Sequence, residues 1–150
     1  MTMRSICFLD GDHRSDLGKC IVALPGNASP EEFLIDYAAA LYELDDQFWT
    51  DQGIIDRGFS KATYRKFRQE IDKFNESIQR MQDNNESTKG KRREFNKKLF
   101  KDNRLFFELL LKHWLHNPDN KAEIDRFYSE FRSMFKRVAP YNEIDPNMWR

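Results

Sequence analysis

The chain has 150 residues, of which 39% are hydrophobic and 14% aromatic; this is enough for the core of one ordinary domain and excludes wholesale disorder. Its 25 basic and 25 acidic residues cancel, so the overall charge provides no attraction to nucleic acid or to a membrane. No stretch approaches the ~20 apolar residues of a membrane span, and Met1–Leu9 lacks the apolar region of a secretory signal. We therefore expect a cytoplasmic protein.

The charges are distributed unequally along the chain. Residues 1–60 hold eleven acidic and four basic residues, a net charge of −7. Residues 61–104 hold seven acidic and fourteen basic residues, a net charge of +7, and residues 105–150 hold seven of each. An acidic front followed by a basic middle requires a functional explanation. We place the expected boundary at residue 60, with a partial α/β unit over 1–60 and a helical region over 61–150.

Two short apolar runs near the N-terminus predict buried strands. They are Ser5–Leu9 and Cys20–Leu24, and the polar loop His13–Lys19 separates them. This loop is too short for a helical crossover between directly paired parallel strands. The strands are therefore expected to form a tight antiparallel pair or to flank a strand that is missing from this chain. Because Cys7 and Cys20 lie inside the apolar runs, we expect both thiols to be buried and reduced.

The first two helices have clear start signals. Ser29 is a good N-cap with Pro30 at the first helical position, and the helix should run to about Leu44. Asp45–Gly58 is then expected to be a loop. Ser60 predicts the start of a second helix, whose apolar side chains recur at steps of three and four. These side chains are Tyr64, Phe67, Ile71, Phe74, Ile78 and Met81.

The remaining helices follow a polar connection at Asp83–Gly90. A third helix is expected to begin near Lys91, and the nearly continuous apolar run Leu105–Trp114 predicts a buried helix. Asn117–Asp119 should end that helix, and a last amphipathic helix should start at about Asp119. The predicted fold is α/β and helix-rich, with a small sheet on the N-terminal side and four or five helices.

The strongest candidate site is Asp10-Gly11-Asp12, which directly follows the first predicted strand. Two carboxylates two residues apart at a strand's carboxyl end can face one divalent cation, and hard oxygen ligands select Mg²⁺ or Mn²⁺. Such an ion promotes phosphoryl transfer by neutralising charge and activating water. We therefore assign metal binding and catalysis to Asp10 and Asp12. The alternative interpretation is a solvated turn with side-chain-to-backbone hydrogen bonds.

Several other polar residues carry weaker signals. His13, Arg14 and Asp16 lie next to the acidic pair and could form the rim of a site, but such residues are more often solvated. His113 and His116 are three residues apart, which places them on one helix face as metal ligation would require. Because no cysteine or third histidine completes a zinc site, we interpret these two histidines as structural or exposed.

The basic middle of the chain contains a candidate nucleic-acid-binding segment. Lys91, Arg92, Arg93 and Lys97 are its central residues, and more lysines follow them. Such a segment can bind phosphate backbones. The alternative, favoured by the flexible loop beside the segment, is a solvated helix face.

The order of several short motifs resembles a known family. Residues 7–12, Cys-Phe-Leu-Asp-Gly-Asp, resemble the aspartate-motif strand of Toprim domains, found near the carboxyl end of ABC-type ATPases of the overcoming-lysogenization-defect family. Four later motifs are similar to the same region of Septu-type and retron-associated defence ATPases: Leu24-Pro25-Gly26, Ser29-Pro30-Glu31-Glu32, Phe48-Trp49 and Gly58-Phe59-Ser60-Lys61. The helical segment with Trp114 and Asn117, followed by Phe127 and Phe131, is similar to their C-terminal tail.

This resemblance implies a Toprim-like α/β fold in which Asp10 and Asp12 bind Mg²⁺ for DNA or RNA cleavage. It also implies an ATPase partner and a role in bacterial defence against phage. Toprim domains carry a glutamate on an earlier strand, and only nine residues precede Asp10 here. We therefore expect that strand to be absent and a second chain to complete the site.

Two functional hypotheses follow. The first is a metal-binding, nuclease-related module that acts in nucleic-acid processing or phage defence together with an ATPase or another chain. The second is a non-catalytic protein-interaction module with a degenerate Toprim-like half-domain. A third interpretation, Asp10 as the nucleophile of a haloacid-dehalogenase-like phosphatase, is disfavoured because Gly11 separates the two acids and His13 follows them. Whether the chain is an enzyme stays open at this point.

Overall fold

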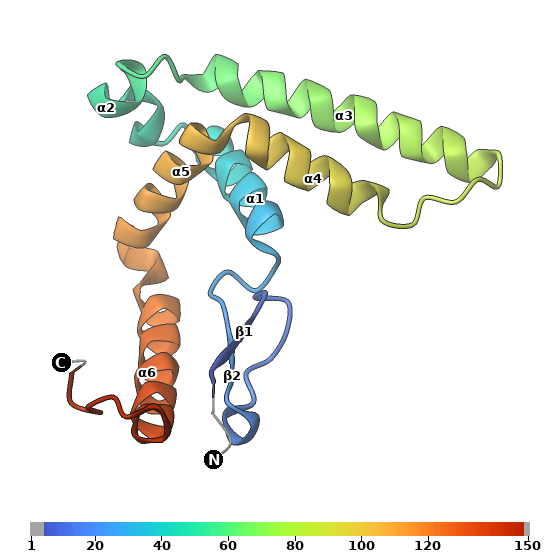
Figure 1. Ribbon diagram of the computed structural model, residues 1–150. Coiled ribbons are helices and arrows are strands. Elements are labelled where there is room, and N and C mark those ends of the chain that lie inside the picture. The colour runs from blue at the N-terminus through green and yellow to red at the C-terminus, as the bar shows by residue number, and fades with distance from the viewer. Residues whose placement is uncertain (1–4, 149–150) are drawn as a thin grey trace. The chain divides into compact units, whose positions relative to one another are not determined.

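The computed structural model describes residues 5–148, and helices dominate it (Figure 1). Within these residues, five helices have twelve or more residues: α1 (Pro30–Glu43), α3 (Lys61–Asp83), α4 (Lys91–Asp102), α5 (Arg104–His116) and α6 (Lys121–Val138). The sheet consists of β1 (Cys7–Leu9) and β2 (Ile21–Ala23). The prediction of a helix-rich protein with a small N-terminal sheet is confirmed. In the described part of the chain, no helix combines the length and apolar character needed to cross a bilayer.

The chain forms two compact units. The first, which we call the terminal unit, comprises Met1–Phe33 and Leu115–Arg150, and the second, the central unit, comprises Leu34–Trp114. The terminal unit therefore brings the sheet together with α6, and the central unit holds α3, α4 and most of α1 and α5. The boundary expected at residue 60 lies inside the central unit.

The two strands of the terminal unit pair directly and in parallel. Cys7 lies opposite Ile21 and Leu9 lies opposite Ala23. The prediction of an antiparallel pair, or of strands flanking a missing one, is wrong. The reason is strand length: three residues span only about 10 Å. A return segment with a single 3-10 turn at Leu17–Lys19 can cover that distance without a helix.

The two strands differ in burial. Val22 of β2 is fully buried, whereas Phe8 of β1 is 45% exposed. Both cysteines are free thiols, as expected, but only Cys20 is buried; the expectation of burial is wrong for Cys7, which is exposed. Each strand of this two-stranded sheet is paired on one edge, so the difference in burial does not come from the strand pairing. The ring of Phe8 packs beside α6, with its centroid 5.6 Å from that of Phe131.

The last helix follows its predicted pattern closely. α6 begins at Lys121, two residues after the expected start, and ends at Val138. Its buried residues Met134 and Val138 pack with Cys20 and Val22 of the terminal unit. This contact explains why β2 is the better-covered strand.

The core of the central unit is aromatic. Phe106 and Phe107 of α5 are among its most deeply buried side chains. The ring of Phe67 on α3 lies 5.0 Å from that of Phe106, and the ring of Trp49 stacks at 6.2 Å. The prediction that α5 is buried all round is wrong, because Leu105 is 49% exposed. α5 instead buries one face, formed by Phe106, Phe107, Leu110 and Trp114.

The segment expected to be a loop after α1 contains two short helical pieces. A 3-10 turn spans Gln47–Thr50 and α2 spans Gln52–Ile55. An aspartate caps each piece: the carboxylate of Asp46 accepts a hydrogen bond from the backbone N–H of Phe48, and that of Asp51 accepts one from Gly53. These two caps and the burial of Phe48 stabilise helical structure in a segment that the sequence predicts to be a loop.

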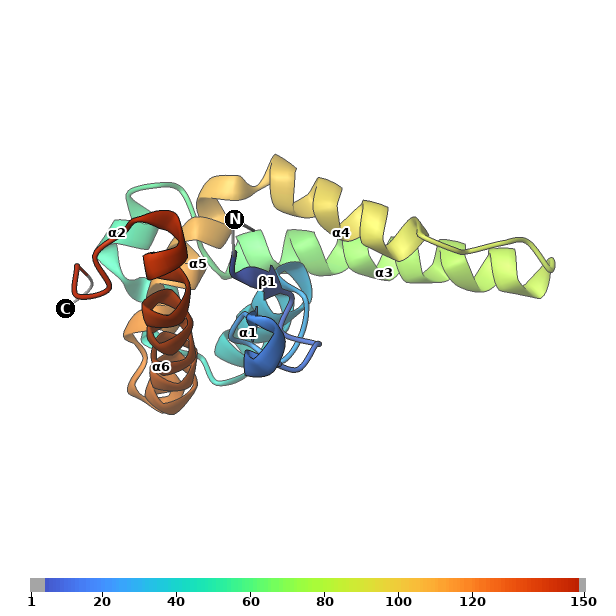
Figure 2. The same cartoon turned by 60° about the horizontal axis from the view of Figure 1, so that its bottom comes forward.

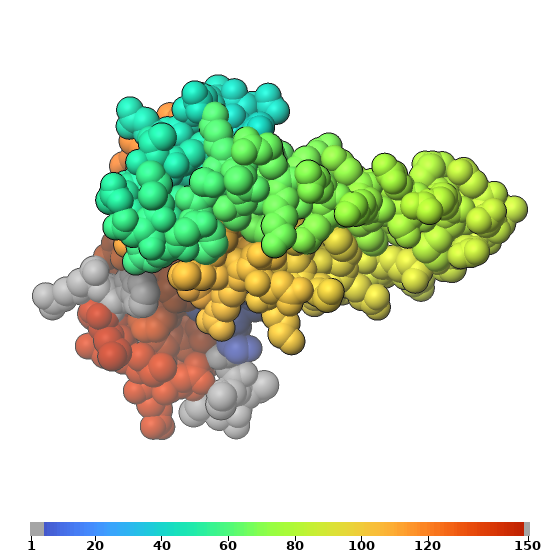
Figure 3. Space-filling model, turned by 90° about the horizontal axis from the view of Figure 1, so that it is seen from above, coloured from blue at the N-terminus to red at the C-terminus, as the bar shows by residue number. Residues whose placement is uncertain are grey.

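α3 and α4 form a helical hairpin, and they lie side by side in Figures 1 and 2. Ser60 caps α3, as predicted, with its side chain accepting from Ala62 and the Thr63 hydroxyl accepting from the Ser60 N–H. Phe74 and Phe95 stack between the two helices, with ring centroids 4.2 Å apart and an interplanar angle of 8°. Figure 3 shows α3 (green) and α4 (yellow to orange) lying against each other.

Candidate functional site

Asp10 and Asp12 lie at the carboxyl end of β1 in one tight turn, which spans residues 10–13 and which we call the acidic turn. The backbone N–H of His13 donates to the carbonyl of Asp10 at 3.0 Å and closes this turn. Both aspartates are exposed. The local order of the sequence therefore brings the two predicted metal ligands into the same turn, where solvent reaches both.

Gly11 is required by a close approach of the chain to itself. A Cβ atom at this position would lie 2.8 Å from the carbonyl oxygen of Leu24 and 2.9 Å from both Asn27 N and the Ala28 carbonyl. Real Cβ atoms do not make such short contacts with backbone. The space that a side chain at position 11 would need is thus filled by the backbone of the segment that follows β2.

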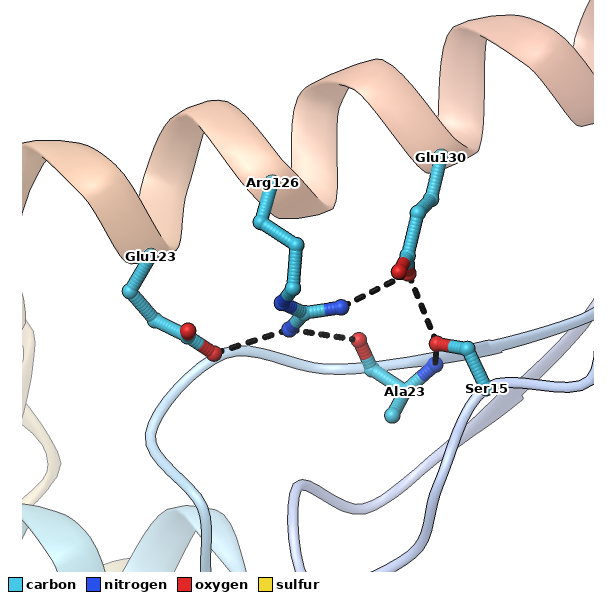
Figure 4. A network of polar contacts seen from close by, with 5 residues as sticks. All are labelled: Ser15, Ala23, Glu123, Arg126 and Glu130. Carbon is cyan, nitrogen blue, oxygen red and sulfur yellow. Dashed lines mark hydrogen bonds and ion pairs between the residues drawn. The ribbon is translucent and has the colours of Figure 1, made fainter.

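Ser15 lies three residues after Asp12 and forms hydrogen bonds to β2 and to α6 (Figure 4). The Ser15 hydroxyl accepts a hydrogen bond from the Ala23 N–H at 2.9 Å and donates to Glu130 Oε2 at 2.7 Å. This serine connects the end of β2 to α6. Asp16, considered above as a rim residue, instead caps the 3-10 turn by accepting from the Lys19 N–H.

Arg126 extends the same network along α6. Its guanidinium donates to Glu123 at 2.8 Å, to Glu130 at 2.7 Å and to the carbonyl of Ala23 at 3.3 Å (Figure 4). The hydrogen bond to Glu123 is the main cause that raises the pKa of Arg126, so the side chain keeps its charge. The network holds β2 and the loop after the acidic turn against α6.

The acidic turn supplies only part of a metal coordination shell. Within residues 5–148, no group of three or more His, Cys, Asp or Glu side chains is arranged to hold a metal ion. His13 is the nearest polar neighbour, with Nε2 3.7 Å from Asp12 Oδ1, and both side chains are more than half exposed. Mg²⁺ is often bound by one or two carboxylates plus waters and substrate phosphates. Asp10 and Asp12 alone would therefore supply only part of the ligands of such an ion.

His113 has a structural role, in agreement with one of the two interpretations offered for it. Its Nδ1 atom lies 2.6 Å from the hydroxyl of Tyr37, and its Nε2 atom lies 3.6 Å from Asp46 Oδ1. These contacts tie α1 and the start of the segment after it to α5. His116, three residues later, is exposed.

The predicted nucleic-acid-binding residues lie on α4. All four, Lys91, Arg92, Arg93 and Lys97, are exposed. Arg92 differs from the others because it packs on α3: its Nη2 atom donates to Asn75 Oδ1 at 3.1 Å, and its guanidinium lies 5.4 Å from the ring centre of Phe74. Arg92 therefore belongs to the hairpin contact as well as to the charged surface.

Three cations recur at four-residue spacing on α4 and share one face of the helix. They are Arg93, Lys97 and Lys101, and we call them the α4 ridge. α4 holds six basic and two acidic residues. Its one ion pair within the described residues joins Lys98 to Asp102, at 3.9 Å. The charge of the ridge is therefore left uncompensated by neighbouring side chains.

Comparison with known protein family models, with curated proteins and with solved structures found no match for this chain.

Some polar residues of this structure were not singled out from the sequence. Arg126 contacts Ala23, which is 103 residues away in the chain, and Tyr37 contacts His113 across 76 residues. No local pattern predicts such long-range pairs. The spacing of Glu123, Arg126 and Glu130 at three and four residues was the one available signal, since it predicts ion pairs on a helix face.

Proposed function

We propose that this chain is a nucleic-acid-binding module in which the α4 ridge contacts phosphate groups. The observation that carries the proposal is the uncompensated positive charge of Arg93, Lys97 and Lys101 on one exposed helix face. When such cations neutralise phosphates, they release the counterions condensed on the nucleic acid, and this release favours binding. Contacts of this kind give binding with little sequence preference.

The alternative for α4 is an ordinary solvated face, and α6 provides an example of one. On α6, Lys121 pairs with Asp125, and Arg126 pairs with Glu123 and Glu130. Pairs at this spacing satisfy the charges within the helix. Glu94 lies three residues before Lys97, but no ridge side chain forms an ion pair within the described residues, and this contrast favours an external anion.

Fluorescence anisotropy with labelled single-stranded and duplex oligonucleotides, measured over a series of salt concentrations, tests the proposal. The variant Arg93→Gln/Lys97→Gln/Lys101→Gln removes the ridge charge. The matched control, Lys121→Gln/Arg132→Gln/Lys136→Gln, removes three exposed charges from α6. On duplex DNA we expect the ridge variant to reduce the slope of log K against log salt by about 2 to 3, since each lost phosphate contact contributes about 0.9.

The control should keep most of the wild-type slope. Equal losses in both variants would mean that net charge alone drives binding and would contradict a specific role for α4. Binding that does not depend on salt would contradict the proposal as a whole.

A second candidate function is the nuclease-related one, with a divalent cation at the acidic turn. The observation that favours it is the placement of Asp10 and Asp12 together, exposed, after the carboxyl end of a strand. When bound, Mg²⁺ or Mn²⁺ would neutralise phosphate charge beside these carboxylates. The role of the two aspartates is to hold the ion, and the remaining ligands would come from a phosphate or a second chain.

Calorimetric titration of Mn²⁺ tests this second candidate. The variant Asp10→Asn/Asp12→Asn should abolish the binding heat, whereas the control Asp36→Asn/Asp119→Asn, which changes exposed acids elsewhere, should leave it unchanged. Titration in the presence of a short oligonucleotide should strengthen binding if phosphate completes the coordination shell. Equal Mn²⁺ binding by wild type and by the Asp10→Asn/Asp12→Asn variant would eliminate the site.

Partners and biological role are proposed from the family resemblance. On that basis the chain is a Toprim-like, cytoplasmic component of phage defence that acts with an ATPase or another protein chain. The competing proposal, a non-catalytic protein-interaction module, is supported by β1, where Cys7 and Phe8 are exposed beside an unpaired strand edge. The two proposals are separated by the Mn²⁺ titration, because only the first requires the acidic turn to bind a cation.

A further inference from the structure

The central unit contains an open groove between α1 and α3. It measures about 510 Å³, which lies within the range of small-molecule binding sites. One wall is formed by α1 and the other by α3. The lining residues are Ala39, Tyr42, Glu43, Tyr64, Arg65, Arg68 and Gln69.

Two tyrosines, Tyr42 of α1 and Tyr64 of α3, give the groove an aromatic lining. The rings of Tyr42 and Tyr64 lie 4.6 Å apart at an angle of 33°. Tyr64 is only 7% exposed, and burial raises the pKa of its hydroxyl, so it stays neutral. A neutral tyrosine offers an apolar face and a hydroxyl that can donate or accept a hydrogen bond.

Two arginines line the α3 wall of the groove. Arg65 and Arg68 are three residues apart on α3 and therefore lie on one helix face. Arg68 forms an ion pair with Asp72, 3.1 Å from its Nε atom. Arg65 has no ion pair within the described residues. Guanidinium groups are the side chains best suited to bind a carboxylate or phosphate through several N–H donors.

The opposite wall limits which anion fits. Glu43 of α1 lines the groove together with Arg65 and Arg68 of α3. The negative charge of Glu43 disfavours a bare anion that fills the groove. It favours a ligand that carries hydroxyl or amino donors for Glu43, an anionic group for the arginines and a planar ring for the tyrosines.

We propose that this groove binds a nucleoside monophosphate, with the phosphate at Arg65 and Arg68, the base at the two tyrosines and hydroxyl or amino donors at Glu43. The same chemistry is present in a free nucleotide and in the phosphorylated end of a nucleic-acid strand. The groove is distinct from the α4 ridge, because none of the ridge residues lines it. This inference therefore does not depend on the function proposed above.

Isothermal titration calorimetry of the full chain with the four ribonucleoside 5′-monophosphates tests the inference. Adenosine and inorganic phosphate are the partial probes, and each should bind about ten-fold or more weakly than AMP. The variant Arg65→Gln/Arg68→Gln should weaken nucleotide binding by about ten-fold or more. The matched control is Arg80→Gln, an exposed arginine further along α3 that does not line the groove.

A second variant keeps the charges of Arg65 and Arg68 and fills part of the groove. Ala39→Leu places a larger apolar side chain in the groove and should also block binding. Unchanged thermal unfolding of the variants would show that they remain folded. The inference is overturned if no monophosphate binds at millimolar concentration, if inorganic phosphate binds as tightly as AMP, or if both groove variants bind like wild type.

Competition by a short oligonucleotide with and without a 5′-phosphate identifies the source of the ligand. This arm uses the Arg93→Gln/Lys97→Gln/Lys101→Gln variant, so that contacts of the α4 ridge do not contribute. If only the phosphorylated strand displaces AMP, and does so at lower concentration than free nucleotide, the groove binds strand ends. If the free nucleotide is at least as tight, the groove binds the small molecule.

Discussion

The hydroxyl of Tyr37 on α1 lies 2.6 Å from Nδ1 of His113 on α5, and this contact joins residues 76 positions apart in the chain. The two rings also pack together, with centroids 5.8 Å apart. The His113 ring also meets the ring of Phe48 edge-on, with centroids 5.1 Å apart. A histidine that the sequence suggested as a weak metal-ligand candidate thus connects helices of the central unit.

Replacement of Tyr37 by Phe removes the hydrogen bond and keeps the ring. Because the contact is partly buried, we expect the free energy of unfolding to fall by about 1 kcal/mol. Urea unfolding followed by circular dichroism measures the change. A double-mutant cycle with His113→Gln isolates the pair, and a coupling energy near zero would show that the hydroxyl and the imidazole do not stabilise the fold together.

Gly11→Ala should destabilise the terminal unit. The added Cβ would lie less than 3.0 Å from backbone atoms of Leu24, Asn27 and Ala28, and backbone cannot rotate away as a side chain can. We expect a loss of about 1–3 kcal/mol in urea unfolding. The control is Gly18→Ala, whose nearest neighbour is a side-chain oxygen of Asp16 at 3.3 Å. An equally stable Gly11→Ala protein would mean that the segment after β2 does not hold the acidic turn closely.

The thiols of Cys7 and Cys20 should react at very different rates. Cys7 is exposed on β1, whereas Cys20 is 8% exposed and packs against α6. Labelling with a colorimetric disulfide reagent at neutral pH should modify one thiol rapidly and the second only after addition of denaturant. The variant Cys7→Ser should lose the rapid phase. A rapid phase that survives in this variant would contradict the burial of Cys20.

Local signals predicted the five long helices, whereas tertiary relationships could not be predicted from the sequence. Ser60 could be identified as a cap because its partners lie within three residues of it. The parallel pairing of Cys7 with Ile21 depends on how the intervening loop returns, and sequence periodicity contains no information on that path. Gly11 stands between two aspartates in the sequence, but its close neighbours lie after β2. The acidic turn could be located from sequence, whereas the finding that no group of three ligating side chains forms within residues 5–148 required the structure.

Tyr64 makes the stability of the central unit sensitive to alkaline pH. Burial is the main cause that raises the pKa of its hydroxyl above the ordinary value of 10.0, and the nearby charge of Arg68 opposes the rise. Above pH 10 the unfolded chain loses this proton more readily than the folded chain, so the free energy of unfolding should decrease as the pH rises through the folded-state pKa. Urea unfolding between about pH 9 and pH 11 measures this decrease.

The variant Tyr64→Phe should show a smaller decrease in the free energy of unfolding than wild type. The control Tyr128→Phe changes a tyrosine that is 41% exposed and should behave like wild type. Identical pH dependence in wild type and Tyr64→Phe would mean that the hydroxyl of Tyr64 ionises as easily in the folded chain as in the unfolded one.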